Sequence, residues 1–285
     1  MILYYLLFPF LYLLAHLPSS ALYRFAEVLA WVLHRVVRYR RQVVLDNLRR
    51  SFPDFSNEQI QQTAAAFYRH LAYRIVENIR CMAITAREVD ARITVENIDA
   101  INHYYNQGRH VVLLLGHIAA WEYSGFKMCI ACKHRPYSFV SNIRNRYFDV
   151  RIQRTRARMG MQLVPMQEAP SFFRKKLTEP SLIVFLGDQS PPNPRRAYRT
   201  TFLNQPTPFF TGGERYARIH NCVVIYPEIV QVKRGYYKAR LIEITDNPLA
   251  LPENEITERY ARLLERQIRN YPPDWLWSHR RWKHT

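Results

Sequence analysis

Hydrophobic positions follow two different spacings along this chain, and the change comes near residue 110. Before it, Ser56 to Gln59 resembles a capping box, and apolar residues then recur every three or four positions, which predicts a core-facing helix over about 57–80. Beyond it lie short, wholly apolar runs typical of buried strands, at 111–115, 182–186 and 223–226. Segments of helical length follow or separate these runs, at about 119–132, 146–159 and 212–220.

Buried strands that alternate with helices predict an α/β fold, in which a mixed, partly parallel sheet is flanked by helices. Residues 237–245 alternate between apolar and polar side chains and are expected to form an edge strand. A last helix is predicted over about 253–270, ending before Pro272 and Pro273. The aromatic and basic tail after it, 275–283, suits either a membrane interface or a cap over an active site.

The first part of the chain has the features of a membrane anchor. Residues 1–17 contain no Asp, Glu, Lys or Arg, and as a helix they span about 25 Å, slightly short for a perpendicular crossing. No basic region precedes this stretch and no small-residue cleavage motif follows it, so a cleaved signal peptide is not expected. An amphipathic stretch over 21–37 comes next, and arginines cluster around 35–50, which favours the cytoplasmic face of a membrane.

We therefore expect a membrane anchor with an amphipathic helix over 1–40 and a catalytic domain over 41–285. Whether the first helix spans the bilayer or lies in its surface stays open. The alternative is that this segment is a buried N-terminal helix of a soluble domain.

The net charge of +18 implies an anionic partner, which charge alone does not identify as nucleic acid, membrane surface, or an acidic substrate or carrier. No nucleic-acid-binding module is recognisable. Cys129 and Cys132 form the one close cysteine pair, with His134 as the only obvious further ligand nearby, so buried thiols are favoured over a metal site. Nothing in the cysteine spacing argues for disulfides, which fits a reducing compartment.

The segment from Gly116 to Glu122 carries the candidate chemistry. His117 and Glu122 are five residues apart, about 140° around a continuous helix, so they meet only if His117 lies in a strand-to-helix turn and Glu122 on the first turns of the helix. In that geometry the carboxylate accepts the proton of one imidazole nitrogen and leaves the other free as a base. Such a base takes a proton from a substrate alcohol that attacks a carbonyl. The alternative is a core histidine bonded to a helix-capping carboxylate.

A second glycine-bounded strand end, Gly187-Asp188-Gln189, is the other candidate, because ligands of such sheets bind beyond the carboxyl ends of the strands. Asp188 suits a residue that orders an arginine, or one that caps a loop. The chain has no Gly-x-Ser-x-Gly elbow and neither of the glycine-rich nucleotide loops, which disfavours serine hydrolases and nucleotide chemistry. A reaction driven by a thioester needs neither of these features.

These residues resemble the lysophospholipid acyltransferase superfamily, with its His-x4-Asp/Glu motif. The chain is more closely similar to the bacterial lipid A biosynthesis lauroyl/myristoyl acyltransferase family, over nearly its whole length. The similarity lies in the following segments: Arg40-Arg41, Asn47-Leu48 and Phe52-Pro53; Gly116-His117 and Trp121-Glu122; Asn145, Phe148-Asp149 and Arg156-x-Arg158; Gly187-Asp188-Gln189; Phe209-Phe210-Thr211-Gly212; and Trp275-Leu276-Trp277-x-His279-Arg280-Arg281-Trp282.

The resemblance implies an O-acyltransferase of lipopolysaccharide biosynthesis at the cytoplasmic face of the bacterial inner membrane. It implies transfer of a fatty acyl chain from acyl carrier protein to a hydroxyl of a lipid A precursor, with His117 and Glu122 on the family's catalytic dyad. It also implies that no cofactor and no metal are needed. Candidate substrate-binding residues are Arg144, Arg156, Arg158, Asp188 and Gln189. Arg156 and Arg158 lie in a basic segment of helical length, 151–158, and they are equally well explained as the solvent-exposed face of that helix.

Three other functions stay open at this point. The same chemistry on another acceptor, such as a glycolipid, phospholipid or aminolipid, with acyl-CoA as a possible donor, is the nearest. A non-catalytic basic protein that binds nucleic acid and a non-catalytic membrane adaptor are the others.

Overall fold

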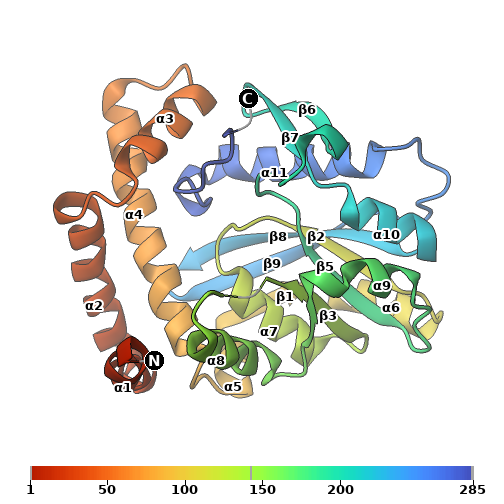
Figure 1. Cartoon of the computed structure of the whole chain (residues 1–285), viewed down its shortest axis with the longest axis horizontal. Coiled ribbons are helices and arrows are strands. Elements are labelled where there is room, and N and C mark those ends of the chain that lie inside the picture. Colours follow the sequence, from red (N-terminus) through yellow and green to blue (C-terminus); the bar gives the residue numbers. More distant parts are fainter. Residues whose placement is uncertain (1, 142, 284–285) are drawn as a thin grey trace.

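The computed structural model describes residues 2–141 and 143–283, and its centre is one mixed sheet of seven strands (Figure 1). The strand order is β1-β9-β8-β2-β5-β3-β4; every neighbouring pair is parallel except β8 and β9, which are antiparallel. The strands of this sheet are β1 Ile93–Glu96, β2 Val111–Leu115, β3 Arg135–Val140, β4 Gln162–Pro165, β5 Ser181–Leu186, β8 Val223–Lys233 and β9 Tyr236–Thr245. A separate hairpin pairs β6 Tyr198–Phe202 with β7 Gln205–Phe209.

Helices cover both faces of the sheet, as expected for strands that are buried on both sides. One face carries α9 Ala169–Arg174, α10 Gly212–His220 and α11 Glu255–Asn270, and the other carries α5 Ala86–Arg92, α6 Ile98–Asn106, α7 Trp121–Ala131 and α8 Arg146–Ala157 (Figure 1). Short helical turns complete the chain at η2 Met166–Glu168, η3 Pro194–Arg196 and η4 Pro272–Asp274. Val111 and Leu113 face one layer and Val112 and Leu114 the other, so the apolar run of β2 fills two cores.

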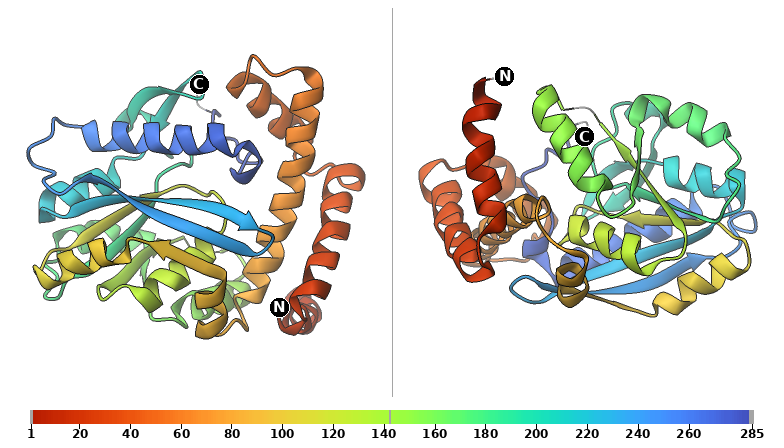
Figure 2. Two further views of the ribbon diagram at one scale, coloured as in Figure 1. Left: turned by 180° about the vertical axis from the view of Figure 1, so that it is seen from behind. Right: turned by 90° about the horizontal axis from the view of Figure 1, so that it is seen from below.

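The N-terminal helices stand across the carboxyl ends of the central strands. The longest is α4, Asn57–Arg80, and it packs against that edge of the sheet (Figures 1 and 2). Its outer side carries α1 Ile2–His16, α2 Ser19–Trp31, the π-helical turn η1 Val32–Val36 and α3 Arg41–Ser51. Leu22, Tyr23 and Ala26 of α2 share a small core with Tyr73 and Val76 of α4. Among the described residues, no helix is both long and apolar enough to cross a membrane.

The predicted α/β class and the mixed, partly parallel sheet are confirmed. The helix predicted at 57–80 is α4, and its capping box between Ser56 and Gln59 is present. The segment 237–245, expected at an edge, instead lies inside the sheet between β1 and β8. The strand expected to stop before Pro227 continues to Lys233. Proline has no backbone N–H, but it fits within a strand at a position where that N–H would not donate to the neighbouring strand.

Candidate active site

The site lies where two parallel strands end side by side. Leu115 of β2 is paired with Leu186 of β5, so the residues beyond them, Gly116-His117 and Gly187-Asp188, are brought next to each other. Helix α11 approaches both turns closely. A Cβ atom on Gly116 would lie 2.8 Å from a methyl group of Leu264, which explains glycine at this position. The sequence analysis placed both turns at strand ends, and the sheet register brings them together.

The imidazole of His117 is hydrogen-bonded to Asp188. The distance from Nδ1 of His117 to Oδ1 of Asp188 is 2.6 Å. The other carboxylate oxygen, Oδ2, accepts the backbone N–H of His117 at 2.8 Å and the indole N–H of Trp275 at 2.9 Å. Asp188 is buried, and donors from two other segments surround it. A carboxylate held by several donors fixes the ring that it contacts in one orientation.

These contacts set the protonation states. Burial by itself raises the pKa of Asp188, but attraction to His117 and the hydrogen bonds from His117 and Trp275 outweigh it and hold this pKa at about 2. Burial lowers the pKa of His117, whereas the nearby charges of Asp188 and, less strongly, Glu122 raise it above its ordinary value. An ionised Asp188 favours the proton on Nδ1, so in the neutral ring Nε2 is the acceptor; Nε2 lies 3.3 Å from the side-chain nitrogen of Gln189.

Glu122 has a different partner from the one expected. His117 does lie in the strand-to-helix turn and Glu122 on the first turn of α7, as predicted. Among the described residues, however, the carboxylate bonded to the imidazole is that of Asp188, and the Glu122 carboxylate is hydrogen-bonded to Arg156 of α8. The Nε atom of Arg156 lies 3.2 Å from both oxygens of Glu122. The predicted direct contact between Glu122 and His117 is therefore wrong, because the carboxylate of Glu122 is bonded to the guanidinium of Arg156 instead.

The C-terminal tail holds the turn that carries His117. Ala119 has a positive φ of 48°, which is unusual for a residue with a side chain. Its N–H donates to the carbonyl of Asp274, and Ile118 forms a β-bridge with Trp275. Trp275 is buried, as are Trp277, Arg281 and Trp282. Burial corrects the membrane-interface interpretation for these four side chains, because the tail is part of the support of the site.

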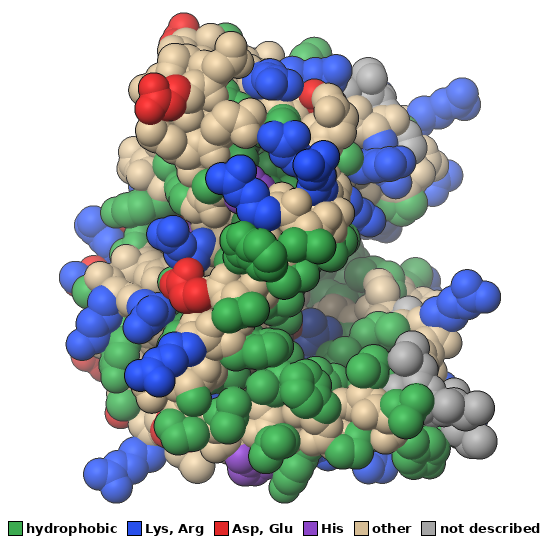
Figure 3. All heavy atoms as spheres, turned by 90° about the vertical axis from the view of Figure 1, so that its left-hand side faces the viewer, with side chains coloured by type: hydrophobic (Ala, Val, Ile, Leu, Met, Phe, Trp, Pro, Cys, Tyr) green, Lys and Arg blue, Asp and Glu red, His purple; other side chains and the backbone are tan. Residues whose placement is uncertain are grey.

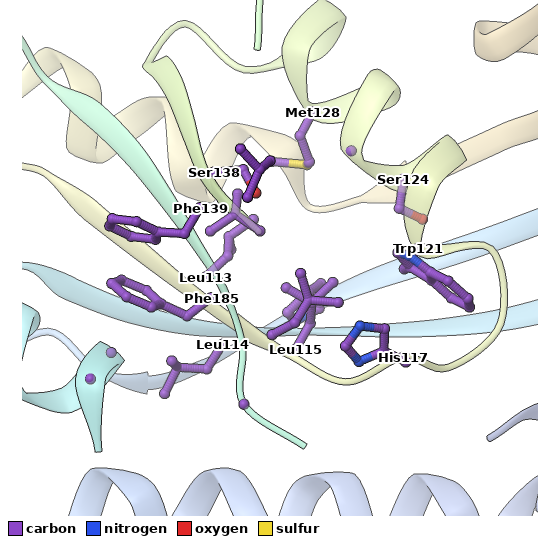
Figure 4. Close-up of a pocket in the computed structure, with 18 of the residues that line it drawn as sticks. Leu113, Leu114, Leu115, His117, Trp121, Ser124, Met128, Ser138, Phe139 and Phe185 are labelled. Atoms are coloured by element: carbon purple, nitrogen blue, oxygen red, sulfur yellow. The ribbon is translucent and has the colours of Figure 1, made fainter. Parts of the chain in front are cut away.

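A largely apolar cavity of about 450 Å³ opens beside His117 (Figure 4). One part runs between the sheet and α7, past Leu115 and Leu113 toward Met128 and Ser138. Another reaches Phe139 and Phe185 near the start of α10. Strands β3 and β5 are paired only as far as Ser138 and Val184 and then part, so the cavity reaches both faces of the sheet. A volume in this range with few polar groups is typical of a site for an extended apolar ligand.

The structure brings together most, but not all, of the predicted site residues. His117, Glu122, Arg156 and Gln189 line the main cavity, and Asp188 lies directly behind the imidazole. Arg158 instead donates to backbone carbonyls, including that of Ile84 at 2.5 Å, and does not line this cavity.

Arg144 is exposed ahead of α8 and also lies outside the lining of the cavity. The sequence analysis missed Trp275 as a partner of Asp188; its place in an aromatic tail was the only signal for it.

Among the described residues, no group of three or more His, Cys, Asp and Glu side chains has the geometry of a metal site. Cys132 lies 3.3 Å from Nδ1 of His134, and both are buried.

Comparison with known proteins identified a family. The family model described as bacterial lipid A biosynthesis acyltransferase matches residues 1–284, almost the whole chain. No curated protein matches. The family match covers both strand ends and the tail that supports them.

Proposed function

Because the chain belongs to the bacterial lipid A biosynthesis acyltransferase family, we propose that it moves a fatty acyl chain from an acyl carrier protein thioester to a hydroxyl of a lipid A precursor. The observation that carries this proposal is the 2.6 Å contact between His117 and Asp188 at the mouth of an apolar cavity. A base at the end of a chain-sized cavity suits transfer of an acyl group.

In this mechanism His117 is the general base. Its Nε2 atom removes the proton of the acceptor hydroxyl while the oxygen attacks the thioester carbonyl. Asp188 holds the imidazole in the required tautomer and stabilises the imidazolium that forms. The C–O bond forms, the C–S bond breaks, and the proton passes from His117 to the departing thiolate. No acyl-enzyme intermediate is formed, since the attacking hydroxyl belongs to the acceptor.

Glu122 acts through Arg156 in this proposal. It keeps the guanidinium at the wall of the cavity, where the positive charge serves the phosphate of the acceptor or the oxyanion of the transition state. The apolar part of the cavity between the sheet and α7 receives the donor acyl chain. No metal and no cofactor are part of this mechanism.

We further propose that α1 and α2 contact the cytoplasmic face of the inner membrane. Leu6 and Leu13 of α1 and Trp31 of α2 are each at least 60% exposed, although all three are large apolar residues. Figure 3 shows hydrophobic side chains gathered on the lower part of this face, with basic side chains above them. Such a surface suits a helix that lies in the membrane interface and an anionic headgroup layer beside it. The proposed division into an anchor over 1–40 and a catalytic domain over 41–285 rests on this surface.

The test uses labelled acyl carrier protein, acyl-CoA as the alternative donor, and a panel of lipid acceptors. We expect transfer by the wild-type chain and none by His117→Ala. The matched control is His103→Ala, which removes an exposed histidine of α6. Full transfer by folded His117→Ala contradicts the mechanism, and a covalent acyl-enzyme on the reaction path contradicts direct attack. The accepting lipid identifies the acceptor class; no transfer to any acceptor contradicts the proposal.

A further inference from the structure

A second cavity, of about 210 Å³, lies beneath α1. Phe8 and Leu11 of α1 form one wall, Ile79 and Met82 come from α4 and the residues that follow it, and Phe148 and Ile152 come from α8. Glu122, Phe126 and Arg156 line both this cavity and the main one. The ion pair of Glu122 with Arg156 therefore stands between two apolar cavities. The transfer mechanism uses only the cavity beside His117.

The second cavity carries one uncompensated positive charge. Arg151 of α8 lines it, with the guanidinium carbon 4.9 Å from the centre of the Phe8 ring. Its Nε atom is buried, and within the described part of the chain its side chain makes no hydrogen bond or ion pair. The other charged groups of the lining, Glu122 and Arg156, are paired with each other. A buried donor without a partner beside apolar walls favours a ligand with an anionic group and a hydrocarbon chain.

The helix over this cavity separates it from the proposed membrane surface. Tyr4 of α1 stacks on Tyr147 of α8 at 5.5 Å between ring centres and makes an edge contact with Phe148 at 5.1 Å. Leu13, on the other side of α1, is 62% exposed, whereas Leu11 is half-buried against the cavity. Figure 2 shows α1 and α8 side by side at one edge of the molecule. The cavity therefore lies between α8 and α1, whose outer side belongs to the proposed membrane surface.

We propose that the cavity beneath α1 is a second lipid-binding site, which takes one hydrocarbon chain of an anionic amphiphile and holds the anionic group at Arg151. The site is distinct from the donor-chain cavity, although its ligand lies against the other side of Arg156. The ligand has two possible sources with the same chemistry, a membrane lipid or the acyl acceptor itself. Binding to this site does not require that the proposed transfer reaction occur.

The first experiment counts dodecyl phosphate molecules bound to the full chain by native mass spectrometry from a neutral detergent. We expect two on the wild type, one after Leu11→Trp, which obstructs the second cavity, and one after Gly125→Leu, which blocks the part of the main cavity between the sheet and α7 to a dodecyl chain. A Cβ atom on Gly125 would meet only a methionine methyl, at 4.0 Å, so a side chain can begin at this position without a clash. Leu13→Trp, on the outer side of α1, is the matched control and keeps two. Two molecules on folded Leu11→Trp overturn the site.

A gentler variant keeps the test decisive if Leu11→Trp does not fold. Arg151→Gln is expected to weaken binding of dodecyl phosphate to Gly125→Leu protein about tenfold and to leave dodecyl maltoside binding unchanged. Equal losses for both ligands, or no loss for either, overturn the role of Arg151. Inorganic phosphate alone is expected not to bind measurably, because the apolar walls supply most of the contact.

Kinetics separate the two sources of the ligand. If the site holds the acceptor, Arg151→Gln raises the acceptor KM and leaves the donor KM unchanged. If it holds a membrane lipid, both values stay unchanged while the loss of dodecyl phosphate binding persists. A chain that binds lipid here but transfers no acyl group contradicts the proposed function and leaves this inference intact.

Discussion

Two carboxylates flank the candidate base, and they are held in different ways. Asp188 is at the end of a central strand, is only 2% exposed, and receives hydrogen bonds from His117 and Trp275. Glu122 is on a helix at the cavity wall, its side chain is 18% exposed, and it holds Arg156 of another helix. The first arrangement is built on the sheet and, in the proposed mechanism, sets the protonation of the base. The second joins helices that flank both cavities and, in the proposed mechanism, positions a cation.

This comparison predicts its largest effect at Asp188. Asp188→Asn removes the charge that raises the pKa of His117 and allows the wrong imidazole tautomer, so kcat is expected to fall roughly 10³- to 10⁴-fold. The acid limb of the pH profile of any residual activity should lie at lower pH than in the wild type. His117 with a lower pKa stays unprotonated, and so active as a base, down to a lower pH. Measurement of kcat/KM against pH tests both points. Asp188→Asn activity within tenfold of wild type would reverse the ranking of the two carboxylates.

Glu122→Gln is expected to cost less. Arg156 loses its ionic partner but the imidazole keeps Asp188, so kcat/KM should fall about tenfold to hundredfold, the equivalent of about 1–3 kcal/mol. Arg156→Gln should cause a similar loss, and the double variant should lose much less than the sum, because the two side chains act as one unit. A loss for Glu122→Gln as large as for Asp188→Asn would instead favour a direct role of Glu122 on His117.

The main cavity offers a test that leaves both carboxylates in place. Gly125→Leu fills the space between the sheet and α7, so the preferred donor should shift to a shorter acyl chain, with about a tenfold change in the ratio of kcat/KM for long and short donors. Gly125→Ala is the matched control and should shift the preference less. An unchanged preference would show that the donor chain occupies another part of the cavity.

Trp275→Phe tests the support of Asp188 from the tail. The carboxylate loses one donor, so more of its negative charge faces His117, and the pKa of His117 should rise further. The acid limb of the kcat/KM profile is then expected to move to higher pH, with a few-fold loss of activity at its plateau. Trp277→Phe is the control, because that indole donates to the carbonyl of Pro272 instead. A shift of equal size in both variants would indicate that the tail as a whole packs less tightly, and not that Asp188 has lost a specific donor.

The smallest effect is expected at a basic segment made of η3 and the first residues of β6. Arg195, Arg196 and Arg199 are exposed and form no ion pair within the described ranges of the chain, which suits contact with an acidic carrier protein. Their replacement by Gln should raise the KM of acyl carrier protein a few-fold at low salt and leave kcat unchanged. Replacement of Arg259, which is paired with Glu255 on α11, is the control. Unchanged donor kinetics in the triple variant would show that this segment does not contact the carrier protein.

The sequence by itself determined the elements and the strand ends that carry chemistry. Wholly apolar runs such as 111–115 and 182–186 favour buried strands because they are only five residues long, and a glycine followed by a polar residue marks where each one ends. Spacing also placed His117 in a turn and Glu122 on the helix after it. Local physical constraints act over a few residues, so local patterns are sufficient to detect them.

Only the tertiary structure decided which charges pair. His117 and Asp188 are 71 residues apart and meet because Leu115 and Leu186 are in register, whereas Glu122 meets an arginine on a helix 34 residues away. The tail supplies Trp275 from 87 residues beyond Asp188. A carboxylate binds the best donor that packing brings to it, and packing depends on the order of strands and helices, which short-range spacing does not record.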